Sequence, residues 1–274
     1  MTEFHKMHGL SNDFVVLDLR HQSFDINPEV AVRLADRRHG VGCDQILILR
    51  QPALPHQQAS FEIWNSDGSQ AEQCGNGVRC LGLYLHMQDE TVEGKATLAG
   101  PADEITINCM EDGMVQVDMG KPDFRAEAIP VNAEQVEGMY QLDSEYGKLA
   151  LGAVSMGNPH ALLVLEDIQS ADLTGMGAFI SRHPAFPAGC NAGFAQVINR
   201  DEIQLRVFER GAAETMACGS GACAAMVILR KACHVNETVR VTQAGGMLII
   251  SWLGENEPVM MTGPAEYVYK GIFI

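Results

Sequence analysis

Two cysteines stand in the same short motif, and a long apolar stretch follows each of them. The first motif is Cys74-Gly75-Asn76-Gly77 and the second is Cys218-Gly219-Ser220-Gly221. Each apolar stretch predicts a buried helix that begins at the motif. Free N–H groups and the macrodipole at a helix N-terminus favour the thiolate form of a cysteine there. The same N–H groups bind anions, and glycine lets a ligand approach the backbone closely. Each motif therefore predicts an activated thiol beside an anion cradle.

A pair of such thiols suits the inversion of a stereocentre. A base on one face of a carbon removes its proton, and an acid on the other face returns one. A thiol whose pKa a helix terminus lowers from about 8.5 matches the operating pH of acid–base catalysis. Neither motif contains a lysine, so they fit neither a pyridoxal Schiff base nor a P-loop. The motifs predict acid–base chemistry without a cofactor.

The segments in front of each cysteine recur in the same order, which indicates a gene duplication. Strands are expected at Phe14–Leu19, Gln45–Leu49 and Phe61–Asn65, and again at His160–Leu165, Ala195–Ile198 and Ile203–Phe208. Ala195–Ile198 aligns with Asp44–Leu47, and placing Cys218 on Cys74 also places Glu209 on Asn65. Two similar α/β domains are predicted, with the ligand in a cleft between them.

The composition limits the partners and the compartment. Acidic residues exceed basic ones by 16, which argues against nucleic acid and against an anionic membrane. No apolar run approaches the roughly 20 residues of a membrane span, and the start of the chain lacks signal-peptide regions. The eight cysteines in a chain without such a signal indicate free thiols rather than disulfides. We expect a cytoplasmic enzyme.

Nine motifs, spread from Met7 to the C-terminal region, together carry a family resemblance. They are Lys6–Phe14, Gly40–Gln45, Asn65–Ser69, Gln73–Cys80, Met156–His160, Glu209–Ala212, Glu214–Thr215, Ala217–Ala222 and Met261–Ala265. With these motifs the chain resembles the diaminopimelate epimerases, pyridoxal-independent enzymes that interconvert LL- and meso-diaminopimelate. The resemblance implies a role in lysine and peptidoglycan precursor synthesis.

The resemblance also implies roles for individual residues. Cys74 and Cys218 would be the acid–base pair, with His160 and Glu209 tuning proton transfer. Neither a cofactor nor a metal is expected, and the partner would be the small-molecule substrate. A homodimer is implied, with Tyr269 near its interface. The implied substrate contacts are Asn12, Gln45, Asn65, Gly75, Asn76, Asn158, Asn191, Glu209, Arg210, Gly219 and Ser220.

The implied fold is mixed α/β (α+β), with two pseudo-symmetric domains that each wrap a curved sheet around a central helix. The first domain would comprise residues 1–119 with a returning C-terminal strand, 264–274, and the second residues 120–263. Three residues depart from the family pattern. Ser11 and Ala213 stand where glycine is usual, and Ala192 replaces a larger aliphatic residue. If either glycine position uses a positive φ, the side chain strains the backbone by about 1 kcal/mol or more.

Three other hypotheses fit parts of the sequence. Another racemase of the same fold would act on proline, hydroxyproline or histidine, although the polar residues and Arg210 favour a substrate with a second charged end. A protein with two reactive thiols could also serve redox chemistry or ligand binding. A structural zinc site from Cys74, Cys80, Cys218 and Cys223 is disfavoured, because the C-x5-C and C-x4-C spacings differ from the usual pairs.

Overall fold

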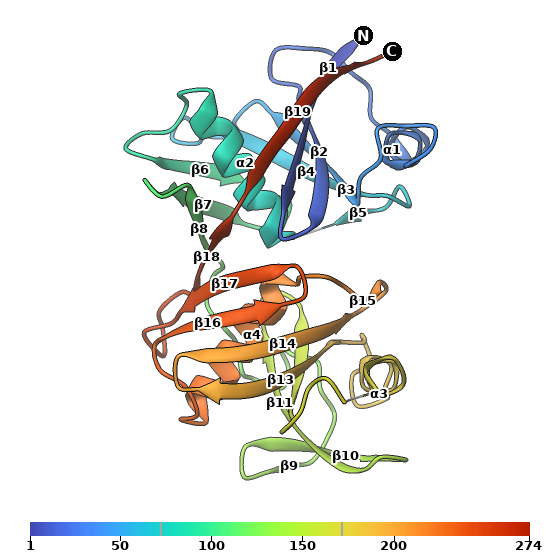
Figure 1. The fold of residues 1–274 in the computed structure, drawn as a ribbon, viewed down its shortest axis with the longest axis vertical. Helices are drawn as coiled ribbons and strands as arrows, with labels where there is room; N and C mark the ends of the chain where they lie inside the picture. The colour runs from blue at the N-terminus through green and yellow to red at the C-terminus, as the bar shows by residue number, and fades with distance from the viewer. Residues whose placement is uncertain (72, 171) are drawn as a thin grey trace. The chain divides into compact units, whose positions relative to one another are not determined.

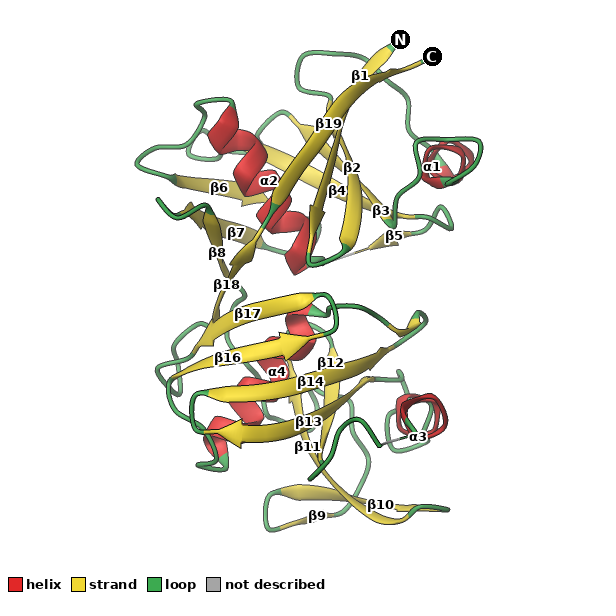
Figure 2. Ribbon diagram, in the orientation of Figure 1, coloured by secondary structure: helices red, strands yellow, loops and turns green. Residues whose placement is uncertain are grey.

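The chain folds into two compact units. The computed structural model describes residues 1–71, 73–170 and 172–274. Unit 1 comprises Met1–Asp118 with Thr262–Ile274, and unit 2 comprises Met119–Met261 (Figure 1). Both units consist mainly of strands (Figure 2), and the described residues of each unit form one long helix and one short helix. Within the described ranges, no helix has the length and apolarity that a membrane crossing requires.

Unit 1 holds the first cysteine motif. Its helices are α1 (Pro28–Ala35) and α2 (Gly75–Met87). Its strands are β1 (Thr2–Gly9), β2 (Asn12–Asp18), β3 (Gln45–Arg50), β4 (Ala59–Asn65), β5 (Gln70–Ala71), β6 (Lys95–Ala99), β7 (Glu104–Cys109), β8 (Met114–Asp118) and β19 (Glu266–Phe273). The strand β18 (Met260–Pro264) leads into the returning C-terminal segment.

The helix α2 is the central element of unit 1, as the sequence predicts. Every residue from Gly75 to Gly82 is buried. The helix contacts β1, β2, β7, β8 and β19, so strands surround it (Figure 2). A side chain at Gly82 would meet Ile107 Cδ1 at 2.8 Å, so glycine permits the close approach of β7. Burial on nearly all faces, together with this close packing, fixes the direction in which the N-terminus of α2 points.

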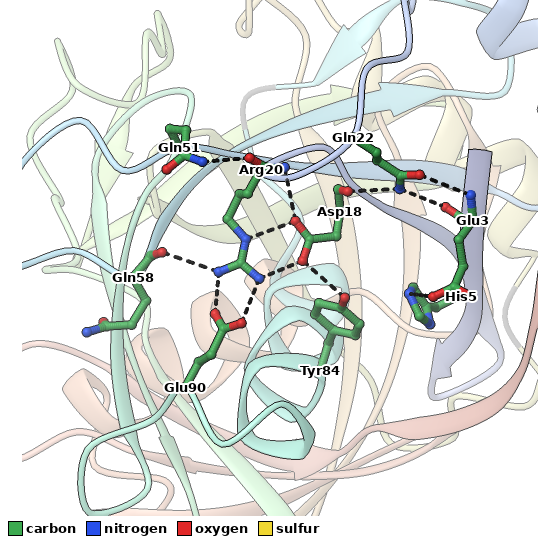
Figure 3. A network of polar contacts seen from close by, with 9 residues as sticks. All are labelled: Glu3, His5, Asp18, Arg20, Gln22, Gln51, Gln58, Tyr84 and Glu90. Atoms are coloured by element: carbon green, nitrogen blue, oxygen red, sulfur yellow. Dashed lines mark hydrogen bonds and ion pairs between the residues drawn. The ribbon is translucent and has the colours of Figure 1, made fainter. Parts of the chain in front are cut away.

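A buried ionic network anchors the other end of α2 (Figure 3). Arg20, which follows β2, donates through Nε to Asp18 Oδ1 at 2.9 Å and through Nη2 to Asp18 Oδ2 at 2.6 Å. Its guanidinium also pairs with Glu90, just beyond the helix. Tyr84 of α2 donates its hydroxyl to Asp18 at 3.1 Å. The Arg20 side chain is 5% exposed, so the pair is shielded from water and geometrically specific.

The sequence predicts a helix with Asn27 as its N-cap, Pro28 at its first position and Gly40 as its end. The short helix α1 begins there but ends earlier. Asn27 accepts the Val30 N–H at 3.0 Å, and Pro28 takes the first helical position, as helix N-termini prefer. The helix stops at Ala35. The expected stop at Gly40 is wrong, because the chain leaves the helix at Asp36 and a turn carries it on to Gly40.

Unit 2 repeats this design around the second motif. Its helices are α3 (Leu173–Ser181) and α4 (Gly219–Lys231). Every residue from Gly221 to Leu229 of α4 is buried. The unit's strands are β9 (Gln135–Val136), β10 (Met139–Ser144), β11 (Gly147–Ser155), β12 (Pro159–Val164), β13 (Asn191–Asn199), β14 (Glu202–Glu209), β15 (Ala213–Glu214), β16 (Thr238–Gln243) and β17 (Gly246–Ser251).

The strand registers show which residues of the two units are equivalent. β2 and β3 are parallel with Phe14 opposite Gln45, and β12 and β13 are parallel with His160 opposite Asn191. Gln45 of β3 lies opposite Asn65 of β4 in an antiparallel pair. The antiparallel pair β13–β14 sets Ala192 opposite Phe208, so Asn191 is level with Glu209. The polar sets Asn12, Gln45, Asn65 and Asn158, Asn191, Glu209 therefore correspond.

One predicted alignment is wrong by this register. Matching Ala195–Ile198 with Asp44–Leu47 places Gln196 on Gln45, whereas the strand ladders place Asn191 there. The cause is the composition of β13. The strand begins with the small residues Ala192 and Gly193, so the apolar run that is recognisable in the sequence starts after the strand itself has started. The register, in contrast, is set by backbone pairing from the first residues.

Candidate functional site

Cys74 caps the N-terminus of α2. Its backbone is extended, with φ −152° and ψ 98°. Its Sγ accepts the Gly77 N–H at 3.4 Å and lies 4.0 Å from Asn12 Oδ1. The side chain is half-buried. The thiol thus occupies the position that an N-cap oxygen usually takes, where helix N–H groups favour negative charge on sulfur.

Cys218 caps α4 in the same way but is buried. Its Sγ accepts the Gly221 N–H at 3.3 Å and lies 3.7 Å from Ser220 Oγ. Burial raises the pKa of this thiol well above its ordinary value, and the charge of Glu209 raises it further; the contacts with Gly221 and Ser220 act in the opposite direction. The helix N–H of Gly221 acts to lower the pKa of Cys218, as predicted, but the expected net lowering is wrong because loss of solvation outweighs it.

Glu209 is the carboxylate beside this second thiol. Burial raises the pKa of Glu209, while hydrogen bonds from Thr215 and Cys218 act to lower it. The Thr215 hydroxyl donates to Glu209 Oε1. Because Asn65 holds the equivalent place in unit 1, one thiol has a neutral amide at this position and the other has a carboxyl group.

His160 is a neutral buried imidazole. It is 2% exposed, and its Nε2 lies 2.9 Å from Asn158 Oδ1. Burial lowers its pKa from 6.5 to about 3, with a further contribution from the positive charge of Arg210. At neutral pH this ring therefore acts as a hydrogen-bonding group rather than as a cation.

Two polar residues of unit 1, Gln45 and Asn65, lie at neighbouring strand ends, and a third, Asn76, lies in the first turn of α2. Gln45 donates Nε2 to Asn65 Oδ1 at 2.8 Å, and Asn65 donates Nδ2 to Ser69 Oγ at 2.9 Å. Asn76 is 4% exposed and accepts from the buried Arg79 at 3.0 Å. These contacts define the orientation of each side-chain amide. An N–H donor identifies the amide oxygen, so the other terminal atom is the nitrogen.

A charge cluster supports Asn12, and the sequence reasoning misses it. Asn12 Nδ2 lies 3.4 Å from Asp44 Oδ2. Arg37 donates to Asp13 Oδ1 at 2.6 Å and to Asp44 Oδ1 at 2.7 Å, and Lys6 also pairs with Asp13. Burial opposes ionisation of Asp13, but its bonds to Arg37 and Lys6 hold the pKa well below the usual range. The cluster joins β1, β2 and the start of β3.

In unit 2, Asn191 and Arg210 lie together. Asn191 Oδ1 accepts the Arg210 backbone N–H at 2.9 Å, and Asn191 Nδ2 donates to the Pro159 carbonyl at 3.3 Å. Arg210 donates Nη1 to the Ala188 carbonyl at 2.9 Å. Arg210 also lines a cavity of about 570 Å³ together with Ser181, Arg182 and Phe208, and among the described residues Cys218 and Glu209 do not line this cavity. An exposed guanidinium in a cavity can bind a carboxylate through two parallel hydrogen bonds.

Two of the three residues that depart from the family pattern lie where the backbone is strained. Ser11 has φ +65° and Ala213 has φ +61°. Leu10 and Ser11 form the two-residue turn between β1 and β2, with Leu10 at φ +55°, and both central residues of such a hairpin turn take positive φ. Ala192, the third departure, is fully buried in β13. Ser11 and Ala213 thus carry the strain that their departures from glycine predict.

The fold matches that of solved racemases and epimerases. A probable proline racemase from Agrobacterium radiobacter K84 has a TM-score of 0.74 at 16% identity, covering 100% of this chain and 93% of that one. A hydroxyproline epimerase from Agrobacterium vitis has a TM-score of 0.71 at 15% identity, covering 98% and 91%. These likenesses show the fold, and in this chain each of the two units of that fold contains a helix capped by a cysteine.

Sequence comparison then identifies the family. The diaminopimelate epimerase family model matches residues 4–125 and 152–268. The diaminopimelate epimerase of Thioalkalivibrio sulfidiphilus is 46% identical over 271 residues, covering 98% of both chains. That of Aromatoleum aromaticum is 46% identical over 270 residues, covering 98% of this chain and 97% of its own. The chain belongs to the diaminopimelate epimerase family.

Proposed function

We propose that this enzyme interconverts LL- and meso-diaminopimelate with Cys74 and Cys218 as its two acid–base groups. One observation carries the proposal: each cysteine caps a buried helix and accepts a helix N–H, from Gly77 at 3.4 Å and from Gly221 at 3.3 Å. The N–H groups favour the thiolate that removes a proton. In the reverse direction the two groups exchange roles, which requires each thiol to gain and lose a proton.

Cys218 rests as the thiol in this proposal. Burial and the charge of Glu209 raise its pKa, so it holds the proton that is returned to the substrate carbon. The developing negative charge spreads into the substrate carboxylate, where backbone N–H groups of Gly75, Asn76, Gly219 and Ser220 would stabilise it. The neutral His160 and the protonatable Glu209 would assist proton transfer as hydrogen-bonding groups.

The polar residues suit a substrate with two amino-acid ends. One end is inverted while the other must be held in a single orientation. Asn12, Asn65, Asn158 and Asn191 each offer a donor and an acceptor, and Gln45 orients Asn65. Arg210 would bind a carboxylate and Glu209 an ammonium group. This set favours diaminopimelate over proline, whose side chain carries no second charged end.

The test is α-proton exchange in heavy water. We expect the purified protein to place deuterium at one α-carbon of diaminopimelate, and Cys74→Ala and Cys218→Ala each to abolish turnover. Cys223→Ala, one turn further along α4 and fully buried, is the matched control and should remain active. Full turnover in either catalytic variant would refute the two-base mechanism. Deuterium exchange into proline or hydroxyproline, with none into diaminopimelate, would refute diaminopimelate as the substrate.

We also propose a cytoplasmic homodimer that serves lysine and peptidoglycan precursor synthesis. The supporting feature is β19, which pairs with β1 in an antiparallel ladder. Val268, Tyr269 and Ile272 on this strand are 53%, 44% and 61% exposed, and exposed apolar edges favour association. Light scattering should give twice the chain mass, and Tyr269→Asp should lower it. A monomeric wild-type protein would exclude the dimer.

A further inference from the structure

The hairpin β16–β17 holds the backbone that enters α4. The Cys218 N–H donates to Gln243 Oε1 at 2.8 Å. The Gly245 N–H donates to the Met216 carbonyl at 2.7 Å. Gln243 is the last residue of β16 and lies opposite Gly246 of β17. The end of the hairpin therefore holds the chain on both sides of Ala217, directly before the thiol.

Only half of the Gln243 carboxamide is used. The side chain is 7% exposed, and its Nε2 is buried without a hydrogen-bond partner among the described residues. A buried donor without a partner is unfavourable. An apolar side chain of the same length would remove that cost but would leave the Cys218 N–H without an acceptor. The contact with the Cys218 backbone is thus what the carboxamide provides.

We propose that Gln243 is a positioning residue for Cys218, which rests on the proposed acid–base role of that thiol. Cys218 has an extended backbone, with φ −118° and ψ 111°, and this places Sγ against the Gly221 N–H. Fixing the Cys218 N–H fixes the preceding peptide plane, and therefore the direction of its Cα–Cβ bond. Without Gln243 Oε1, the Cys218 N–H turns toward another acceptor. Cys218 Sγ then moves away from the Gly221 N–H.

Two variants distinguish the role of the acceptor, Gln243 Oε1, from that of the donor, Gln243 Nε2. Gln243→Met keeps the side-chain length and removes both, while Gln243→Glu keeps an acceptor oxygen. We expect Gln243→Met to lower kcat by about ten- to a hundredfold with little change in KM, because misplacement of a reacting group slows chemistry rather than binding. Gln243→Glu should recover most of kcat. Gln204→Met in β14, where Gln204 lies opposite Thr242 of β16, is the control and should retain wild-type kcat.

A second measurement needs no substrate. Alkylation by iodoacetamide, followed for each cysteine peptide by mass spectrometry, reports the pH dependence of each thiolate. In Gln243→Met the midpoint for Cys218 should move to higher pH, since the thiolate loses the Gly221 N–H, and that for Cys74 should not move. If the proposed function fails, wild-type turnover is absent while this shift persists.

Three results would overturn the positioning role. Equal loss of kcat in Gln243→Met and Gln243→Glu would show that the acceptor does not matter. A raised KM with unchanged kcat in both would show that Nε2 binds the substrate directly. Altered alkylation of Cys74 as well as Cys218 would indicate a general loss of structure, which thermal unfolding of each variant would also reveal.

Discussion

His160 should make unit 2 sensitive to acid. Its pKa is about 3 in the folded protein and 6.5 when unfolded. A lowered folded pKa gives stability that is present above pH 6.5 and is lost as the pH falls toward 3, because the unfolded chain binds the proton first. Between pH 7 and pH 5, linkage gives a loss of about 2 kcal/mol in the free energy of unfolding from this residue alone. Protonation of the His160 imidazole should therefore account for part of the acid unfolding of unit 2.

The assay exploits the distribution of tryptophans. The chain has two, and they lie in different units, Trp64 in unit 1 and Trp252 in unit 2. A Trp64→Phe background leaves Trp252, which is 4% exposed, as the reporter of unit 2. Urea unfolding at pH 7 and pH 5 is compared with and without His160→Gln. The variant should lose about 2 kcal/mol less than its parent over this interval. The same loss in both proteins would refute the assignment.

Three more perturbations test other parts of the structure. Arg20→Met should lower the unfolding free energy of unit 1 by about 3 kcal/mol, because it leaves the Asp18 carboxylate unpaired; unchanged urea unfolding would contradict this. Ser11→Gly should raise Tm, because glycine adopts the left-handed φ without strain. Glycine also adds entropy to the unfolded chain, so the net gain in the free energy of unfolding should be about 0.5–1 kcal/mol. An unchanged or lower Tm would argue against strain at Ser11. Glu209→Gln should move the alkylation midpoint of Cys218 to lower pH, and an unchanged midpoint would show that the charge of Glu209 does not reach the thiol.

Local sequence signals predict the elements of this protein well. The cysteine motifs place α2 and α4 correctly, and Asn27 with Pro28 marks the start of α1. The two-domain fold and the family also follow from the sequence, because repeated motifs preserve the order of strands and helices. These features depend on residues that are neighbours along the chain.

The electrostatic properties of the site could not be predicted in the same way. Whether a helix terminus or burial controls the pKa of Cys218 depends on how completely the fold excludes water there. Gln243 lies in a different strand from the cysteine whose N–H it accepts. Asp13, Asp44 and Arg37 form their cluster only when β2 and β3 pair. Such contacts between distant segments leave no periodic or motif signal in one sequence.

The pairing of β19 with β1 sets an order for folding during synthesis. β19 pairs along its length with β1, so Thr2 lies opposite Phe273. Unit 2 is continuous, Met119–Met261, and can complete its own sheet as soon as it leaves the ribosome. Unit 1 must wait for β19 to be synthesised, since the long loop between β1 and β19 must close before these two strands can pair. The unit that is begun first is therefore completed last, and β1 stays without this partner strand until Glu266–Phe273 has been synthesised.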